Sequence, residues 1–302
     1  MTGNYEKTTN NNVVPKTKIP VQKWENYPEA SEFTINWLGH SSLLIQMNGN
    51  NILIDPVLKT YASPVTFVGS KRFADIPILS KDVPEIDTLL ISHDHYDHLD
   101  YQTIKAIDKK VKNYVVPLGV DSYLKSWGID ENKIHVLNWW DKVSINGIEY
   151  VSTPARHYSG RNPLKANSTL WSGYYFKDAN NSVFYTGDSG YSEVFKEIVE
   201  KCGNVDILFA DSGQYNKAWS QIHMNPLDSL QVAVDVQAKY FIPVHWGTFA
   251  LSDHDWNAPI RIAYQNKDKY GVNLITPQIG ERVKYAEIEN YKNVWWNLDE
   301  ND

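Results

Sequence analysis

Five apolar segments of this chain end at or close to an aspartate or a histidine, and this recurrence limits the folds that the sequence can adopt. The segments are residues 51–54, 88–91, 183–185, 205–210 and 241–244, and the polar residues after them are Asp55, His93, Asp188, Asp211 and His245. Aspartate is common where strands turn, so chance explains one such ending. Five endings predict strands that share one edge, along which these side chains gather.

Strand-like and helix-like patterns alternate along the chain, which indicates an α/β architecture. Residues 33–37 and 42–47 resemble strands, and the Asn-Gly-Asn-Asn sequence at 48–51 predicts a hairpin turn. Residues 101–110 are expected to form a helix. Because the second half of the chain repeats this pattern, we expect two sheets packed face to face with helices outside.

Residues 1–30 are polar and rich in asparagine, and Pro15, Pro20 and Pro28 interrupt them. We expect them to form an arm without a core of its own. Residues 31–302 are expected to form a single domain. The chain has 302 residues, of which 42% are hydrophobic, and this is enough to fill a full core.

Charge and apolar content restrict the partners and the compartment. The formal net charge is −7 and the sequence has no run of lysine and arginine, which argues against a nucleic-acid partner. The chain has one cysteine, no secretory signal pattern, and no apolar run near the roughly 20 residues of a membrane span. We therefore expect a cytoplasmic protein that contacts membranes only peripherally.

Residues 91–100 hold the densest group of candidate metal ligands. Three histidines and an aspartate fall within six residues: His93, His95, Asp97 and His98. Imidazole nitrogens and carboxylate oxygens are ligands of zinc in catalytic sites. A tight turn can direct His93 and His95 to one ion, and Asp97 and His98 to a neighbouring ion. The alternative, a solvated polar loop, gives no reason for so many histidines.

Four ligands do not complete two metal sites, so the chain needs further ligands. His157, Asp188 and His245 are the candidates. Each is weak alone, because a single histidine at a strand end is more often structural than a ligand. Together they have the right number and order. Asp94 and Asp100 are expected to hydrogen-bond the turn or to cap the helix that follows it.

The ordered set resembles the signature of the metallo-β-lactamase fold superfamily: His-x-His-x-Asp-His, then a histidine, a bridging aspartate and a last histidine. The resemblance implies an αββα sandwich with two divalent metal ions, expected to be zinc, at one edge. It assigns one ion to His93, His95 and His157, and it makes Asp188 the bridge. It assigns the other ion to three residues, Asp97, His98 and His245.

Several short segments resemble the N-acylphosphatidylethanolamine-hydrolysing phospholipase D family. They include Trp-Leu-Gly-His at 37–40, His-Leu-Asp-Tyr at 98–101 and His-Trp-Gly-Thr-Phe-Ala-Leu at 245–251. The family also has a histidine, closely followed by a proline, before the last ligand. His223 and Pro226 match that pattern, so His223 is a candidate to protonate or position the departing group.

The remaining candidates have supporting or substrate-binding roles. Asp55, which matches an earlier aspartate of the superfamily, and Asp211 are expected to orient the histidine ligands by hydrogen bonds. Tyr158, Tyr215 and Trp219 are candidates to line a substrate groove, and ordinary packing is the alternative. Segments 158–169 and 210–216 depart from the family, which leaves the acyl-chain specificity open.

Three further histidines stand outside the ligand pattern. His40 is expected to be structural, and His135 and His254 are expected to lie at the surface.

The resemblance implies a phosphodiesterase of phospholipase D type, which cleaves N-acylphosphatidylethanolamine to phosphatidic acid and N-acylethanolamine. A lactonase or sugar-phosphate lactonase is a second hypothesis, because the same activated water can attack the carbonyl of a cyclic ester. A third is a metal-holding binding protein without activity, and the complete ligand set argues against it. The family resemblance also allows a homodimer.

Overall fold

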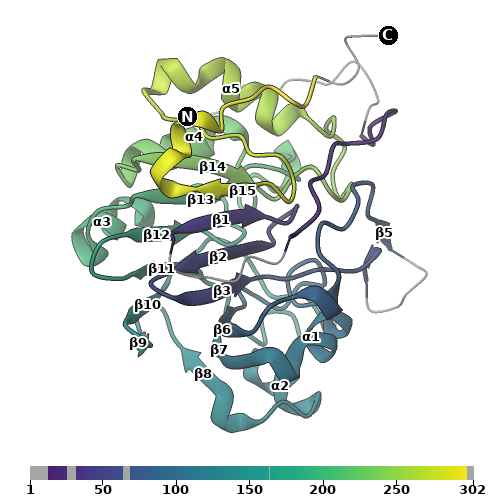
Figure 1. Cartoon of the computed structure of the whole chain (residues 1–302), viewed down its shortest axis with the longest axis vertical. Helices are drawn as coiled ribbons and strands as arrows, with labels where there is room; N and C mark the ends of the chain where they lie inside the picture. The colour runs from purple at the N-terminus through teal and green to yellow at the C-terminus, as the bar shows by residue number, and fades with distance from the viewer. Residues whose placement is uncertain (1–12, 26–31, 64–68, 163, 298–302) are drawn as a thin grey trace.

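Two β-sheets pack face to face and helices cover their outer faces (Figure 1). The structure, a computed structural model, describes residues 13–25, 32–63, 69–162 and 164–297. Helices α1 and α2 lie against the first sheet, and α4 and α5 lie against the second. The αββα sandwich expected from the sequence is confirmed.

The first sheet has seven described strands, in the order β15 (Arg282–Lys284), β1 (Thr34–Trp37), β2 (Leu43–Met47), β3 (Asn50–Ile54), β6 (Ile86–Leu90), β7 (Val111–Pro117) and β8 (Ile134–Leu137). Strands β15, β1, β2 and β3 pair antiparallel. Strands β3, β6, β7 and β8 pair parallel, so their carboxyl ends lie on one side of the sheet.

The second sheet has six described strands, in the order β14 (Tyr240–Val244), β13 (Ile207–Asp211), β12 (Ser182–Tyr185), β11 (Gly173–Lys177), β10 (Ile148–Thr153) and β9 (Lys142–Ile145). Strands β12, β13 and β14 pair parallel, and the others pair antiparallel. A separate ribbon consists of β4 (Tyr61–Ala62) and β5 (Ser70–Lys71).

The described α-helices are α1 (Tyr101–Ile107), α2 (Asp121–Ser126), α3 (Lys196–Cys202), α4 (Pro226–Asp235) and α5 (Ala258–Tyr270). Short 3₁₀ helices are η1 (Ser80–Asp82), η2 (Asp108–Lys110), η3 (Glu131–Lys133), η4 (Glu193–Phe195), η5 (Lys217–Trp219) and η6 (Tyr285–Asn290). No helix among the described residues is both long and apolar enough to cross a membrane.

Side chains that alternate between the two faces of the first sheet divide the apolar core into two clusters. Ile45 of β2 belongs to the larger apolar cluster, which also contains Phe176 of β11 in the facing sheet. Its neighbour Leu44 belongs to the other cluster, together with Ile104 of α1. Because successive side chains of a strand point to opposite faces, both faces of β2 are buried. This accounts for its nearly continuous apolar sequence.

The observed strands lie within two residues of the expected ones. The first hairpin turn is shorter than expected, because only Asn48 and Gly49 turn, with φ of 49° and 71°, and Asn50 already pairs in β3. Positive φ at both positions is typical of a type I′ turn. The expected helix 101–110 ends as an α-helix at Ile107 and continues as η2, and Asp100 caps it as expected.

The described part of the N-terminal arm lies against the domain. Ile19 is buried in the larger apolar cluster, and the backbone N–H of Gln22 donates to the carbonyl oxygen of Ile279. Residues 1–12 and 26–31 of this region lie outside the described residues. The expected boundary at residue 30 falls among them and stays a prediction.

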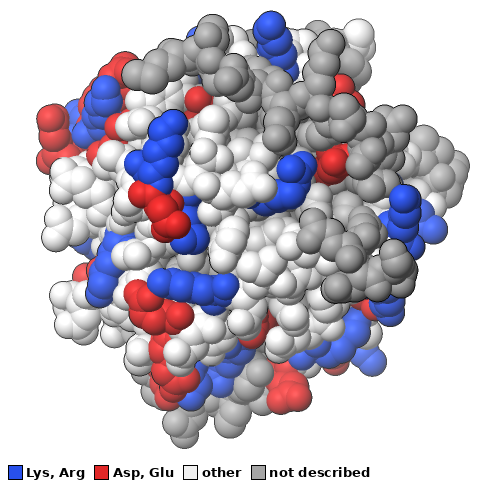
Figure 2. Space-filling view, turned by 90° about the horizontal axis from the view of Figure 1, so that it is seen from above, with Lys and Arg blue, Asp and Glu red and all other residues white. Residues whose placement is uncertain are grey.

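Figure 2 shows the charges on one face of the molecule. Acidic and basic side chains are interspersed there, with uncharged surface between them. Within the part of that face that the structure describes, no continuous basic stripe is present.

Asn225 caps α4, because its side-chain oxygen accepts from the backbone N–H groups of Leu227 and Asp228. Asn225→Ala should lower the free energy of unfolding by about 1 kcal/mol. Urea denaturation followed by tryptophan fluorescence measures this loss. Ser192→Ala is the control, since Ser192 precedes η4 without a side-chain capping bond. Equal losses in the two variants would contradict the capping role.

Candidate metal centre

The strand ends meet along one edge between the two sheets. Strands β3 and β6 of the first sheet and β12 to β14 of the second lead to the loops that carry the candidate ligands. The sheets are in direct contact here, because the hydroxyl of Tyr185, at the end of β12, donates to Asp55 Oδ2 at 2.6 Å. This is the shared edge that the sequence predicted, and we call it the metal edge.

Three imidazoles converge at one end of the metal edge, and we call His93, His95 and His157 the first cluster. His95 Nδ1 lies 2.9 Å from His93 Nε2 and 3.1 Å from His157 Nε2. His157 Nδ1 lies 3.0 Å from the carbonyl oxygen of Ile222 and must donate to it, which leaves a lone pair on Nε2. Burial holds the pKa of His93 and of His157 well below 6.5, so both rings are neutral. Neutral imidazole nitrogens that converge in this way fit a cation.

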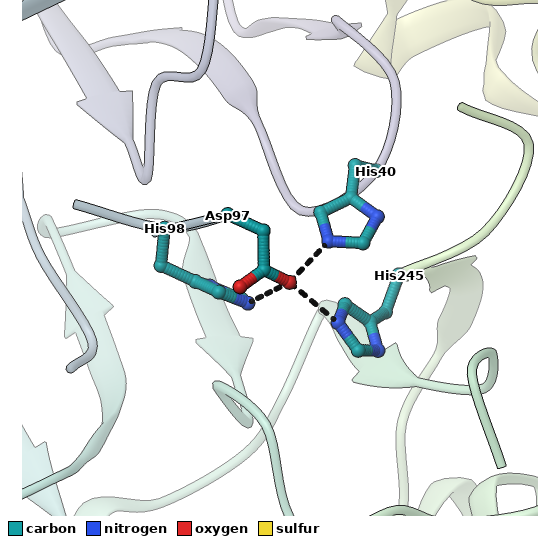
Figure 3. A group of neighbouring side chains, drawn as sticks. All are labelled: His40, Asp97, His98 and His245. Carbon is teal, nitrogen blue, oxygen red and sulfur yellow. Dashed lines mark hydrogen bonds and ion pairs between the residues drawn. The ribbon is translucent and has the colours of Figure 1, made fainter. Parts of the chain in front are cut away.

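Asp97, His98 and His245 lie together at the metal edge with His40 beside them (Figure 3), and we call the first three residues the second cluster. Asp97 Oδ2 lies 3.5 Å from His98 Nε2 and 3.4 Å from His245 Nε2. Ligand atoms of a tetrahedral ion with bonds of about 2.0–2.1 Å lie about 3.3 Å apart. The second cluster therefore also fits a cation.

Asp188 lies between the two clusters. Its Oδ2 is 3.1 Å from His98 Nε2 and 3.2 Å from His245 Nε2 in the second cluster. In the first cluster the same oxygen is 3.8 Å from His93 Nε2 and 3.9 Å from His157 Nε2. Asp188 Oδ1 is buried and has no hydrogen-bond partner among the described residues. Asp188 is therefore placed to contact ions in both clusters, as the sequence pattern implies.

Two further aspartates hold the outer nitrogens of the histidines. Asp55 Oδ2 lies 2.8 Å from His98 Nδ1, and Asp211 Oδ1 lies 3.1 Å from His245 Nδ1. Both carboxylates are fully buried. With Nδ1 donating to a carboxylate, Nε2 of each ring turns its lone pair to the metal edge. The structure thus places Asp55 and Asp211 where their expected supporting role needs them.

The buried carboxylates of Asp188 and Asp211 favour positive charge on the groups beside them. Burial by itself would lower the pKa of His245, but Asp188 and Asp211 raise it to about 10. Burial also opposes ionisation of Asp188, yet His245 and His98 hold its pKa well below 3.8. The carboxylates therefore attract positive charge more strongly than burial opposes it. Divalent cations meet this demand where the imidazole nitrogens converge.

A cavity of about 400 Å³ opens over both clusters. Its wall includes His95, Asp97, Asp188, His223 and His245, and also Ala62, Tyr96, Tyr158, Gly160, Gln214, Trp219, Ile222 and Leu251. The ring of Tyr158 lies 4.6 Å from that of His95, and Trp219 donates its indole N–H to the carbonyl oxygen of Gln214 at 2.8 Å. Tyr158 and Trp219 thus line the space above the ligands, as expected.

Tyr215 and His254 differ from their sequence-based expectations. Tyr215 is not among the residues that line the cavity, and it is only 6% exposed. Its ring stacks on His254 with centroids 4.4 Å apart. His254 is buried rather than at the surface, and its Nε2 accepts from the backbone N–H of Gln214. Tyr215 therefore packs inside the protein against His254 and does not line the cavity as a substrate contact would. His135 is half-buried.

Arg161, for which no role was expected, anchors the segment 158–169. Its guanidinium donates to the carbonyl oxygens of Asp94 and Leu99 at 3.1 and 2.7 Å, and it lies 4.2 Å above the ring of Tyr96. The backbone N–H of Gly160 donates to Asp94 Oδ1. These bonds attach the segment to both sides of the ligand turn 93–98. An arginine in a divergent segment carries no local signal of this role.

The sequence profile of the beta-lactamase superfamily domain matches residues 50–246. An uncharacterised protein of Mycobacterium tuberculosis is 35% identical over 289 residues, which cover 94% of this chain and 77% of that protein. The N-acyl-phosphatidylethanolamine-hydrolysing phospholipase D 1 of Caenorhabditis elegans is 32% identical over 275 residues, covering 85% of this chain and 77% of that protein. The mitochondrial N-acyl-phosphatidylethanolamine-hydrolysing phospholipase D of Saccharomyces cerevisiae is 34% identical over 250 residues. These residues cover 80% of this chain and 53% of that protein.

Among solved structures, a possible metal-dependent hydrolase of Veillonella parvula superposes with a TM-score of 0.68. It is 18% identical and covers 84% of this chain and 100% of its own length. At this identity the likeness supports the fold.

Asp188→Asn should weaken metal binding in both clusters, because one carboxylate oxygen faces both. His157→Ala should chiefly weaken metal binding in the first cluster. Stepwise zinc titration against a chromogenic chelator, with elemental analysis of the purified variants, measures both effects. His135→Ala is the control, since His135 bonds to Asn113 outside the metal edge. A selective loss in Asp188→Asn, with one cluster unchanged, would exclude the bridging role.

Proposed function

The chain belongs to the beta-lactamase superfamily domain family, and from this premise we propose that it is a dinuclear zinc phosphodiesterase of phospholipase D type. Its substrate in this proposal is N-acylphosphatidylethanolamine, and the products are phosphatidic acid and N-acylethanolamine. The class of metal-dependent hydrolase is supported by the family and by three overlapping groups of histidines and aspartates whose ligand atoms lie close enough together to hold a metal ion.

One observation carries the choice of substrate. The two relatives from worm and yeast are both named for hydrolysis of this lipid, and they align with 85% and 80% of the chain. The alignments therefore extend over most of the chain and are not limited to the ligand motifs. The choice of zinc rests on the ligands, which are imidazole nitrogens and carboxylate oxygens.

The reaction breaks the bond between phosphorus and the ethanolamide oxygen. Divalent cations would supply Lewis-acid activation of water and neutralise charge on the phosphoryl oxygens. The water oxygen becomes bonded to phosphorus, and a proton must reach the departing oxygen. Asp188 keeps the two clusters at a fixed separation, because its carboxylate faces both. Tyr158 covers the first cluster and restricts the access of bulk water from that side.

In this proposal His223 supplies the proton. It lines the cavity, and its ring stacks on His245 with centroids 4.9 Å apart. His223 Nδ1 lies 2.8 Å from Asp211 Oδ2 and donates to it, because a carboxylate only accepts. With Nδ1 fixed in this way, Nε2 is the atom that can exchange a proton with the departing oxygen. Asp211 thus orients one ligand, His245, and one catalytic histidine.

The cavity has the size of a small-molecule site, for which about 300–1,000 Å³ is typical. In our proposal the phosphodiester enters it and the acyl chains extend across its mouth. Tyr158 and Leu251 line the cavity and are each 40% exposed, so they offer apolar surface at that mouth. Such side chains provide the peripheral lipid contact that a net charge of −7 does not.

Hydrolysis in ¹⁸O-labelled water tests the proposal directly. Attack at phosphorus should place ¹⁸O in phosphatidic acid and leave the ethanolamide unlabelled, as measured by mass spectrometry of both products. If the metal-loaded protein leaves this lipid and other phosphodiesters intact but opens lactones rapidly, the lactonase hypothesis replaces this one.

His223→Ala should lower kcat by about 10²–10⁴-fold, the usual contribution of a general acid. Its metal content should stay near that of the unchanged protein, because His223 serves the substrate in this proposal. His135→Ala is the matched control for loss of a histidine. A fall in metal content parallel to the fall in kcat would show that His223 acts on the ions instead.

A further inference from the structure

His40 lies at the metal edge although it stands outside the ligand pattern. It follows β1, is fully buried, and its ring centroid lies 4.3 Å from that of His245 and 5.7 Å from that of His98. Figure 3 shows the His40 ring directed at Asp97, which also faces the two ligand histidines. The expectation that His40 is only structural therefore needs revision.

The three nitrogens around Asp97 Oδ2 lie at different distances from it. His40 Nε2 lies 2.8 Å from Asp97 Oδ2, a normal length for an N–H that donates to a carboxylate. The ligand nitrogens of His98 and His245 lie 3.5 and 3.4 Å from the same oxygen, close to the separation of about 3.3 Å expected of two ligands on one tetrahedral ion. Asp97 Oδ2 therefore receives a hydrogen bond from His40 and lies at ligand separation from His98 and His245.

The proton on the imidazole of His40 is fixed by its surroundings. A carboxylate accepts hydrogen bonds, so Nε2 must carry the proton that it shares with Asp97. His40 Nδ1 is buried and has no hydrogen-bond partner among the described residues. The edge of the ring packs against Phe249, with centroids 5.3 Å apart. The side chain thus makes one directed polar contact, and Asp97 receives it.

The backbone of His40 holds another ligand of the second cluster. Its carbonyl oxygen accepts from the backbone N–H of His245 at 3.0 Å and from the indole N–H of Trp37 at 2.8 Å. Its own N–H donates to the carbonyl oxygen of Trp246. One residue, shortly after β1, therefore bonds Asp97 through its side chain and His245 through its main chain.

We propose that His40 is a positioning residue for the second metal ion: it holds Asp97 and His245 in the arrangement that binds this ion. The first cluster has other supports, since His93 Nδ1 faces Ser92 Oγ and His157 Nδ1 faces the carbonyl oxygen of Ile222. Loss of the His40 imidazole is therefore selective for the second ion. This inference rests on the metal-dependent part of the proposed function and is independent of its substrate.

Two variants distinguish the effect of losing the N–H donor of His40 from the effect of losing its ring. His40→Phe keeps a ring without the N–H, and His40→Gln keeps an amide N–H. Glutamine suits this position because Gln214 and Gln237 have φ of 55° and 52°, close to the 53° of His40. His135→Phe is the control for loss of a histidine with one side-chain partner, Asn113.

Metal-free protein and each variant are titrated with cobalt(II), and the visible absorption of the first and second bound ion is followed. His40→Phe should bind the second ion about 10–100-fold more weakly, the usual effect of losing a bond that orients a ligand. The affinity and spectrum of the first ion should stay unchanged. His40→Gln should recover most of the affinity for the second ion, and His135→Phe should bind both ions normally.

A double-mutant cycle with Asp97→Ala separates positioning from a general effect on folding. In the Asp97→Ala background, His40→Phe should add little further loss for the second ion, because the contact is already gone. If His40→Phe folds poorly without metal, His40→Ala takes its place in the cycle. Additive losses, equal weakening of both ions, or wild-type affinity in His40→Phe would each overturn the proposal. None of these outcomes depends on turnover of the lipid.

Discussion

The buried carboxylate of Asp55 is the interaction on which the metal edge depends. It follows β3 in the first sheet, and it accepts hydrogen bonds from Tyr185 of the second sheet and from Ser92 and His98 of the ligand turn. Leaving a buried carboxylate without one of its hydrogen-bond donors costs at least about 1–3 kcal/mol, so Asp55 fixes its neighbours firmly. Through this one side chain, the packing of the two sheets sets the position of a metal ligand.

Backbone conformation at the metal edge shows that the site is held by the fold and not by local preference. His40, Asp55 and His245 have φ of 53°, 40° and 69°, a region that residues other than glycine seldom occupy. Each such residue costs about 1–3 kcal/mol, and the conformation persists only where its surroundings impose it. The bonds of His40 to His245 and Trp246, and the bond from Asp55 N–H to the carbonyl oxygen of Leu90, impose it here. The hydrogen bonds of the folded chain therefore hold these backbone conformations, and with them the side chains of the metal edge, without the help of a bound ion.

Features that depend on residues close together in the sequence could be predicted, and contacts between distant segments could not. Strand positions follow from apolar alternation, and the ligand turn 93–98 is visible because its ligands are only a few residues apart. Asp55 and Asp211 were identifiable because each stands at a strand end. The position of His40 beside Asp97 could not be predicted, because it depends on a bridge to Trp246, which is far away along the chain. Tyr215 was misplaced for a similar reason, since its stacking on His254 is a contact between two loops.

The attachment of the segment 158–169 by Arg161 has a consequence for how the family can diversify. The bonds that Gly160 and Arg161 make to the ligand turn lie at the start of the segment. Leu164, further along the segment, is 92% exposed and packs against little of the fold. Substitutions at the exposed tip of this segment can therefore accumulate without loss of the bonds that attach it to the ligand turn.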